Sequence, residues 1–276
     1  MNDYHYNEND YLSALVTAQP ELLLTLSHFG IPMGFGDKTI SQVCHENGVD
    51  PKFFLLICQV YSNDNYSPTA TTLRSTPMEG LIPYLLRSHD YYLNRRLPHI
   101  GHHLEKIAAL LPERAGKAII KFFNAYIEDV REHFGHEETT VYPHISHLLG
   151  GESKDNFKIK DFLESHGNLE DKLSDLVQII FKYLPASPNL EDCHTPPVSP
   201  SSLEGELITA PSRSYLEGEL ITAPSRSCLE VELHDDDSID MIFDILQLSR
   251  DLRKHAIIED KILGPYVKQL EKSSRL

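Results

Sequence analysis

Two segments far apart in the chain carry the same arrangement of histidine, glutamate and proline. One covers residues 133–143 and the other residues 255–265. In each, a glutamate stands four residues after the first histidine, an apolar residue stands eight after it, and a proline stands ten after it. A spacing of four places His133 and Glu137, or His255 and Glu259, on one face of an α-helix, about 5–6 Å apart at Cβ. One site can therefore take both side chains from each helix.

A shorter motif is also duplicated. Its two copies are Leu86-Arg87-Ser88-His89 and Leu163-Glu164-Ser165-His166. Each copy adds a single histidine and precedes one of the longer segments. The pattern indicates a helical hairpin that occurs twice, with two histidines and one glutamate in each copy.

Six polar side chains of these motifs lie within apolar stripes of helical spacing, and we expect them to face a core. They are His89, His133, Glu137, His166, His255 and Glu259. A buried carboxylate is costly unless it is paired or binds a metal. A single interior histidine, or one His-x3-Glu pair, is usually an ordinary core feature. The duplication favours two cations that share both carboxylates, iron best, with manganese or zinc as alternatives.

The spacing of apolar residues predicts long helices joined by short loops. The stretches are 77–111, with interruptions near Pro98 and Gly101, then 115–149, 157–184 and 238–272. Thr76, Pro77 and Glu79 suggest a capping box at the first start. We therefore predict an all-α fold in which residues 77–272 form an up-down four-helix bundle.

Two other regions flank or interrupt this bundle. Residues 1–68 predict a small helical domain, with helix starts at Thr39 and Pro51, and residues 69–76 predict a polar linker. Residues 185–235 are rich in Pro, Ser and Glu and repeat a block of 13 residues, from Leu203 and again from Leu216. We expect this insertion to be mostly disordered.

The duplicated motifs resemble the haemerythrin-type HHE cation-binding domain over residues 80–272. The whole chain resembles the repair-of-iron-centres family, including its N-terminal domain over residues 26–51. The resemblance implies a haemerythrin-like bundle with two iron ions, bridged by carboxylates and an oxo or hydroxo group. It assigns the ligands to His89, His133, Glu137, His166, His255 and Glu259. Many members carry adjacent cysteines where this chain has Met33-Gly34-Phe35-Gly36, so a thiol role is not carried over.

The resemblance implies a non-haem di-iron protein that repairs or protects iron-sulfur clusters damaged by oxidative or nitrosative stress, as an iron donor. Its partners would be damaged iron-sulfur proteins. Reversible binding or sensing of dioxygen or nitric oxide is an alternative, and a di-iron nitric-oxide reductase or oxidase is another. We favour a non-enzymatic protein, and a homodimer remains open.

Charge and composition narrow the partners and the compartment. The chain has 41 acidic and 25 basic side chains and a net charge of −16, which argues against binding to nucleic acid or to anionic membranes. No apolar run reaches the length of a membrane span, and no secretory signal is visible at the N-terminus. Four scattered cysteines fit a reducing cytoplasm.

Several side chains near the motifs are secondary candidates. His99, His102 and His103 could form a relay for incoming iron, although a solvated helix turn is the more common outcome. Glu138 and Asp260 could orient ligands by hydrogen bonds or lie on a charged outer face. Tyr92 and Tyr126 could lie near the metals, with core packing as the ordinary alternative.

Overall fold

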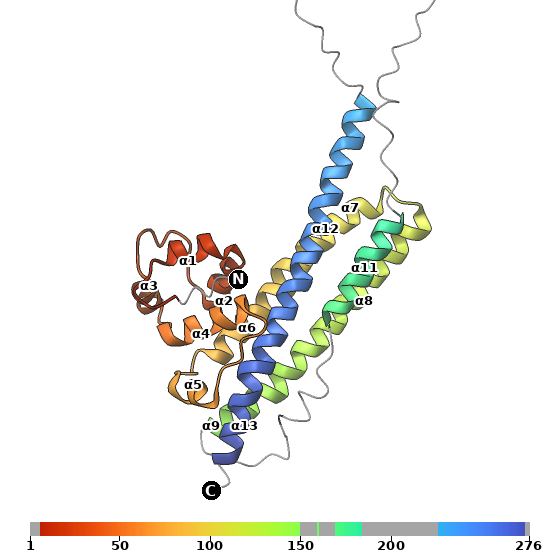
Figure 1. The fold of residues 1–276 in the computed structure, drawn as a ribbon. Coiled ribbons are helices and arrows are strands. Elements are labelled where there is room, and N and C mark those ends of the chain that lie inside the picture. The colour runs from red at the N-terminus through yellow and green to blue at the C-terminus, as the bar shows by residue number, and fades with distance from the viewer. Residues whose placement is uncertain (1–5, 150–158, 160–168, 184–225, 274–276) are drawn as a thin grey trace, which may run out of the picture.

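The computed structural model describes residues 6–149, 159, 169–183 and 226–273, and only the backbone of residues 170–171, 226–236 and 273. Within these ranges every regular element is helical, and β-structure is limited to an isolated bridge between Tyr11 and Thr39. The all-α prediction is therefore confirmed for the described residues. Figure 1 shows a cluster of short N-terminal helices beside a group of longer ones.

Short helices form the N-terminal unit. They are α1 (Leu12–Ala18), the 3₁₀ turn η1 (Pro20–Leu22), α2 (Leu23–Phe29), α3 (Ile40–Glu46), α4 (Pro51–Ser62) and α5 (Ala70–Ser75). The predicted helix starts are confirmed. Thr39 and Gln42 form a capping box at α3, and the Asp50 carboxylate accepts two backbone N–H groups ahead of Pro51 at α4.

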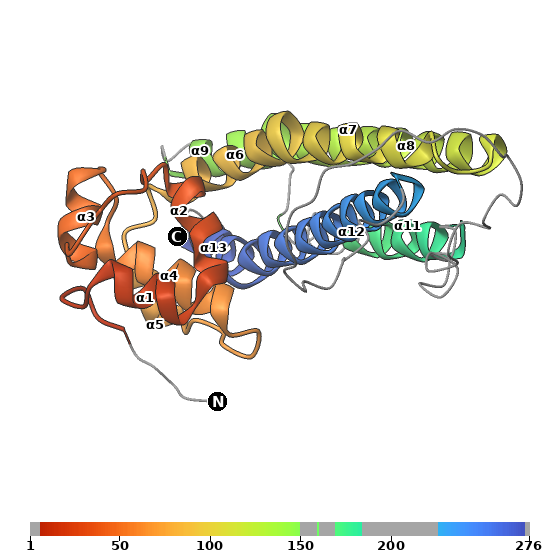
Figure 2. The same cartoon turned by 90° about the horizontal axis from the view of Figure 1, so that it is seen from above.

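The remaining described residues form four helical columns. The first joins α6 (Leu81–Tyr91), η2 (Tyr92–Arg96) and α7 (Leu97–Ala108), and the second joins α8 (Glu113–His136), η3 (Glu137–Val141) and α9 (Tyr142–Leu149). The third is α11 (Leu169–Tyr183), and the fourth joins α12 (Arg226–Ile258), η5 (Glu259–Leu263) and α13 (Gly264–Ser273). α7 packs against α8, α8 against α11, α11 against α12, and α12 against α7, which closes a ring of neighbours (Figure 2).

Three of these columns contain a turn of π-helix: η2, η3 and η5. The Tyr142 N–H donates to the Glu137 carbonyl, and the Gly264 N–H donates to the Glu259 carbonyl, so each hydrogen bond spans five residues instead of four. Such turns insert one extra residue and are frequent at functional sites. Two of them begin at the two glutamates of the duplicated motif, so the duplication extends to the backbone.

The interruption predicted near Pro98 and Gly101 is wrong. α7 runs through both residues, and the irregular turn is η2, which lies just before them. Pro98 lies in the first turn of α7. A proline is tolerated there because its missing N–H would have no normal helical partner.

Other predicted boundaries are also wrong. Residues 69–76, predicted as a linker, contain α5, whose Leu73 is buried and which packs against α13. Thr76 does not cap the next helix, since its hydroxyl donates to the Thr72 carbonyl at the end of α5, and α6 begins at Leu81. α12 begins at Arg226, so residues 226–235 of the predicted disordered insertion are helical. The rest of that insertion lies outside the described residues.

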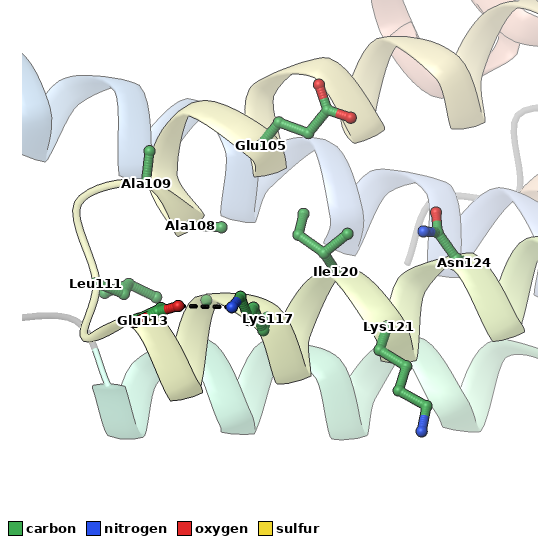
Figure 3. Close-up of a pocket in the computed structure, with 10 residues that line it drawn as sticks. Glu105, Ala108, Ala109, Leu111, Glu113, Lys117, Ile120, Lys121 and Asn124 are labelled. Atoms are coloured by element: carbon green, nitrogen blue, oxygen red, sulfur yellow. Dashed lines mark hydrogen bonds and ion pairs between the residues drawn. The ribbon is translucent and has the colours of Figure 1, made fainter.

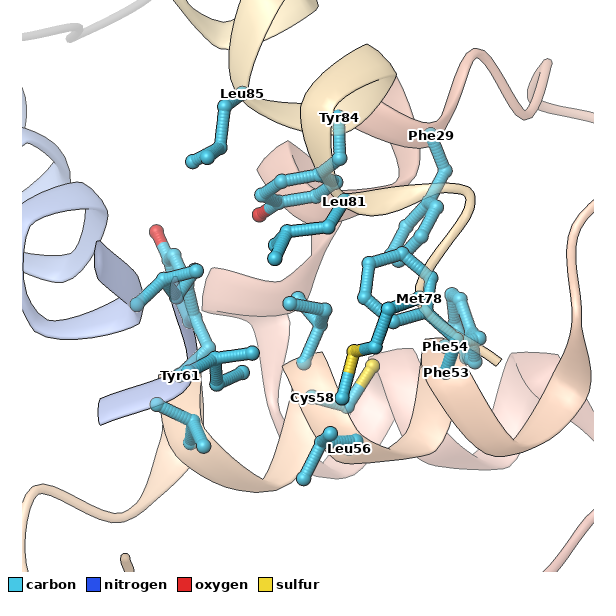
Figure 4. Packing of buried hydrophobic residues seen from close by; sticks show 14 of the residues in the cluster. Phe29, Phe53, Phe54, Leu56, Cys58, Tyr61, Met78, Leu81, Tyr84 and Leu85 are labelled. Carbon is cyan, nitrogen blue, oxygen red and sulfur yellow. The ribbon is translucent and has the colours of Figure 1, made fainter. Parts of the chain in front are cut away.

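The N-terminal unit and the bundle share one hydrophobic cluster. Phe29, Phe53 and Phe54 of the N-terminal unit pack with Met78, before α6, and Tyr84, within it (Figure 4). The same cluster continues along η3, α9, η5 and α13. A second cluster fills the bundle from Tyr92 onward, between α7, α8, α11 and α12. His89, Glu137 and His255 lie along their helices between residues of these two clusters.

The far end of the bundle is closed by a tight α7–α8 turn. Gly116 approaches Ala108 so closely that a Cβ at this position would lie 2.3 Å from the Ala108 carbonyl oxygen, so a larger residue would force the helices apart. An open hollow of about 640 Å³ beside this turn is lined by Glu105, Leu111 and Lys117, among others, and by none of the ligand candidates (Figure 3). No described helix has the length and apolar character needed to span a bilayer.

Candidate metal centre

Four of the six predicted ligands converge in the core. His89 lies near the end of α6, Glu137 begins η3, His255 lies near the end of α12, and Glu259 begins η5. One ligating atom from each residue falls within 4.8 Å of the others. The four residues are between 0 and 4% exposed to solvent. The apolar stripes therefore predicted their orientation correctly.

The ligating atoms face one another directly. The Nε2 atom of His89 lies 3.2 Å from Nε2 of His255 and 3.1 Å from Oε2 of Glu137. Nε2 of His255 lies 3.4 Å from Oε1 of Glu259. Whether these nitrogen and oxygen atoms attract or repel one another depends on which ring nitrogens of the two imidazoles carry protons.

The hydrogen bonds at Nδ1 indicate the tautomer of His89. Its Nδ1 lies 2.9 Å from Oε1 of Glu138, a carboxylate that accepts hydrogen bonds, so Nδ1 carries the proton. In the neutral ring, Nε2 then presents its lone pair to the cluster. Glu138 thus orients His89 by a hydrogen bond, which is the first of the two roles that the sequence suggested for it.

His255 is held in the same tautomer by a serine. The hydroxyl of Ser88 donates to the Leu85 carbonyl at 2.6 Å, so its oxygen accepts from Nδ1–H of His255 at 2.9 Å. The lone pair of His255 therefore also points inward, at that of His89. Ser88 and His89 are adjacent in the shorter duplicated motif, so one turn of α6 supplies a ligand candidate and fixes another.

Two facing lone pairs and two buried carboxylates repel one another unless positive charge lies between them. A metal cation supplies that charge and accepts all four groups, and the alternative is additional protons on the histidines. Imidazole and carboxylate donors suit iron, manganese and zinc, so the residues present fit the predicted metals.

Glu137 links this cluster to a fifth predicted ligand. Its Oε2 faces His89, and its Oε1 lies 2.8 Å from Nε2 of His133. One carboxylate thus presents each oxygen to a different imidazole, an arrangement that would suit two neighbouring metal ions. The His133 side chain is 18% exposed, and this residue lies outside the tight group of four. His166, the sixth predicted ligand, lies outside the described residues.

Aromatic side chains enclose the centre. Phe134 stacks on the His89 ring with 3.9 Å between centroids. The Tyr142 hydroxyl lies 3.3 Å from Nε2 of His89 and donates to Oε1 of Glu259 at 3.4 Å. Burial and the neighbouring Glu259 and Glu137 carboxylates raise the pKa of Tyr142, so it stays a neutral donor.

The tyrosines named from the sequence have other surroundings. The hydroxyl of Tyr92 donates to the backbone carbonyl of Asp251 at 3.2 Å, while its ring contacts His255 edge-on. Tyr126 packs within the second hydrophobic cluster. Tyr142 was missed because η3 adds one residue to the turn and brings position 142, five after Glu137, over the glutamate.

His28 was also missed. It lies near the end of α2, is buried, and contacts the rings of Tyr84, Tyr91 and Tyr92. Burial, reinforced by His255 and His89, lowers the pKa of His28 to about 3, so its ring is neutral. The sequence predicts the α2 helix but not its contact with α6, and that contact brings His28 towards the centre.

Asp251 lies one turn before His255 and is fully buried. Its Oδ1 accepts from the Tyr61 hydroxyl at 3.1 Å and from Gln247 Nε2 at 3.0 Å. Burial raises the pKa of Asp251 to about 6. The hydrogen bond from Tyr61 to Asp251 joins α4 to α12, and so connects the N-terminal unit to the column that contains His255 and Glu259.

Comparisons of the chain with models of protein families, with curated proteins and with solved structures found no match.

Proposed function

We propose that this chain is a non-haem di-iron protein of the cluster-repair type. The observation that carries the proposal is the convergence of His89, Glu137, His255 and Glu259, with both imidazole lone pairs turned inward. Two irons would be held by these residues together with His133 and His166, in a haemerythrin-like bundle capped by the N-terminal unit. The sequence resemblance, not the geometry, points to repair or protection of iron-sulfur clusters.

The arrangement of the ligands suggests how iron could leave. Bound iron would supply redox chemistry and be the cargo for a damaged cluster. His133 is 18% exposed at its side chain, whereas His89 and His255 are 1% and 3% exposed. Iron held between Glu137 and His133 would therefore exchange first, while Glu138 and Ser88 keep the buried imidazoles in place.

Repair is tested by incubating the iron-loaded protein anaerobically with a dehydratase whose iron-sulfur cluster has been damaged. We expect dehydratase activity to recover, and to recover far less with His255→Ala. His136→Ala is the matched control, because His136 is exposed on the same helix as His133. Absence of recovery with fully loaded wild-type protein would contradict the repair role while leaving the metal centre intact.

Reversible binding of dioxygen or nitric oxide is the second candidate function. The Tyr142 hydroxyl favours it, because a neutral donor beside His89 and Glu259 could form a hydrogen bond to a bound gas. An oxygenated or nitrosylated absorption spectrum that reverses under vacuum, and that shifts in Tyr142→Phe, would support it. A spectrum insensitive to gas would exclude it.

A further inference from the structure

A second group of metal-ligating side chains lies where α7 meets α12. His99 and His103 come from α7 and Asp244 comes from α12, and one ligating atom from each falls within 4.8 Å of the others. The side chain of His99 is 51% exposed and that of Asp244 is 18% exposed. The group is therefore open to ions in solution.

The two histidines have the spacing of a helical metal-binding pair. His99 and His103 are four residues apart in a regular α-helix, and their ring centroids are 4.5 Å apart. Histidines at this spacing on one face chelate a single zinc ion in several helical motifs. His102 lies on the same turn but is not part of the group.

Asp244 provides the third donor from the facing helix. Its Oδ2 lies 3.3 Å from Nε2 of His99, while its Oδ1 accepts from Nη2 of Arg96 at 2.8 Å. Arg96 fixes the carboxylate with one oxygen turned towards the histidines and also offsets its charge. Two imidazoles and one partly neutralised carboxylate favour a borderline ion such as Zn²⁺ over Mg²⁺ or Ca²⁺, which require several oxygen ligands.

We propose that His99, His103 and Asp244 form a second metal site, which takes a zinc-like divalent ion and joins α7 to α12. His99 is ten residues from His89, which corresponds to about 15 Å along a helix at 1.5 Å per residue. The two sites therefore share no ligands. The proposal does not depend on iron at the buried centre or on cluster repair.

The test is a titration of the full-length, metal-stripped chain with Zn²⁺ against a chromophoric chelator. We expect wild-type protein to bind one more zinc ion per chain than His99→Ala, or to bind that ion at least about tenfold more tightly. Asp244→Asn should cause a similar loss while preserving side-chain volume. His102→Ala should bind zinc as wild type does.

Thermal unfolding gives an independent measurement, since an ion that joins two helices stabilises only the folded chain. Zinc should raise the Tm of wild type and His102→Ala by several degrees more than it raises the Tm of His99→Ala or Asp244→Asn. Equal zinc binding and equal Tm shifts in all four proteins would overturn the proposal. A loss in His102→Ala as large as that in His99→Ala would also overturn it.

Discussion

The two copies of the longer duplicated motif present the same candidate ligands but have different surroundings. The His255 side chain is 3% exposed, and α12 packs against α4 of the N-terminal unit. The His133 side chain is 18% exposed, and among the described helices α8 has no comparable packing against the N-terminal unit. The difference indicates that the N-terminal unit encloses one half of the centre and leaves the other half nearer to solvent.

The two copies also differ one residue after the π-turns. Tyr142 follows η3 and places a hydroxyl against His89 and Glu259, whereas Gly264 follows η5 and has no side chain. The duplicated pattern thus supplies the candidate ligands, while the departures from it determine which other side chains contact them.

The largest effect should distinguish the two histidines. His255→Ala removes a buried candidate ligand that water cannot easily replace, and we expect iron affinity to fall by more than about 100-fold. His133→Ala opens a position that water can reach, so affinity should fall by only about tenfold. Competition with a ferrous chelator measures both values, with His136→Ala as the unaffected control. Equal losses at the two positions would remove the asymmetry.

Burial of His28 in the N-terminal unit should make the stability of the folded chain depend on pH. Folded His28 has a pKa of about 3, so in the unfolded chain, where the pKa is near 6.5, it takes up a proton that the folded chain does not. The contribution of His28 is therefore fully present above pH 6.5 and declines as the pH is lowered towards 3. At about 1.4 kcal/mol per pKa unit, and with partial relaxation of the folded chain around the charged ring, we expect the free energy of unfolding to fall by about 2–3 kcal/mol between pH 7 and pH 4.

Urea unfolding of the metal-free chain between pH 7 and pH 4 measures this effect. His28→Phe keeps an aromatic ring among Tyr84, Tyr91 and Tyr92 and should reduce the slope. His45→Phe makes the same change at an exposed position in α3 and should retain the wild-type slope. An unchanged slope in His28→Phe would show that His28 is not neutral in the folded chain.

The groups that orient the buried histidines should have smaller effects. Glu138→Gln weakens the acceptor for Nδ1–H of His89, and Ser88→Ala removes the acceptor for Nδ1–H of His255. Partners of this kind typically contribute 10–100-fold to metal affinity, so we expect about tenfold for each variant. The same chelator competition tests both, and wild-type affinity in Ser88→Ala would contradict the tautomer assigned to His255.

Tyr142→Phe should have the smallest effect. It removes a hydrogen bond to Glu259, so the metal-free chain should lose about 1 kcal/mol of stability. Because Tyr142 is not a predicted ligand, iron affinity should change less than in Ser88→Ala. A larger loss of iron in Tyr142→Phe would instead identify the phenol as a ligand.

Helical periodicity was sufficient to predict much of the centre. Spacing alone indicated that the four converging side chains face the core. His89 and His255 lie in regular α-helices, and Glu137 and Glu259 are the first residues of the π-turns, so the α-helical spacing still holds up to them. It could not place Tyr142, since a π-turn shifts every later residue by one position and has no clear signature in the sequence.

Contacts between segments distant in the sequence could not be predicted either. His28 and Asp251 acquire their roles from the contacts of α2 with α6 and of α4 with α12, and local pattern contains no information about such contacts. The polar composition of residues 69–76 suggested a linker. The burial of Leu73 depends on packing of α5 against α13, which is distant in the sequence.

Metal content per chain tests the central claim most directly. The protein is purified without oxygen, loaded with ferrous iron, freed of unbound ions and analysed for iron and protein. We predict about two iron ions per wild-type chain, as expected for a carboxylate-bridged pair, and almost none in a Glu137→Gln/Glu259→Gln double variant that remains folded by circular dichroism. Wild-type protein that retains no more iron than the double variant would contradict the account.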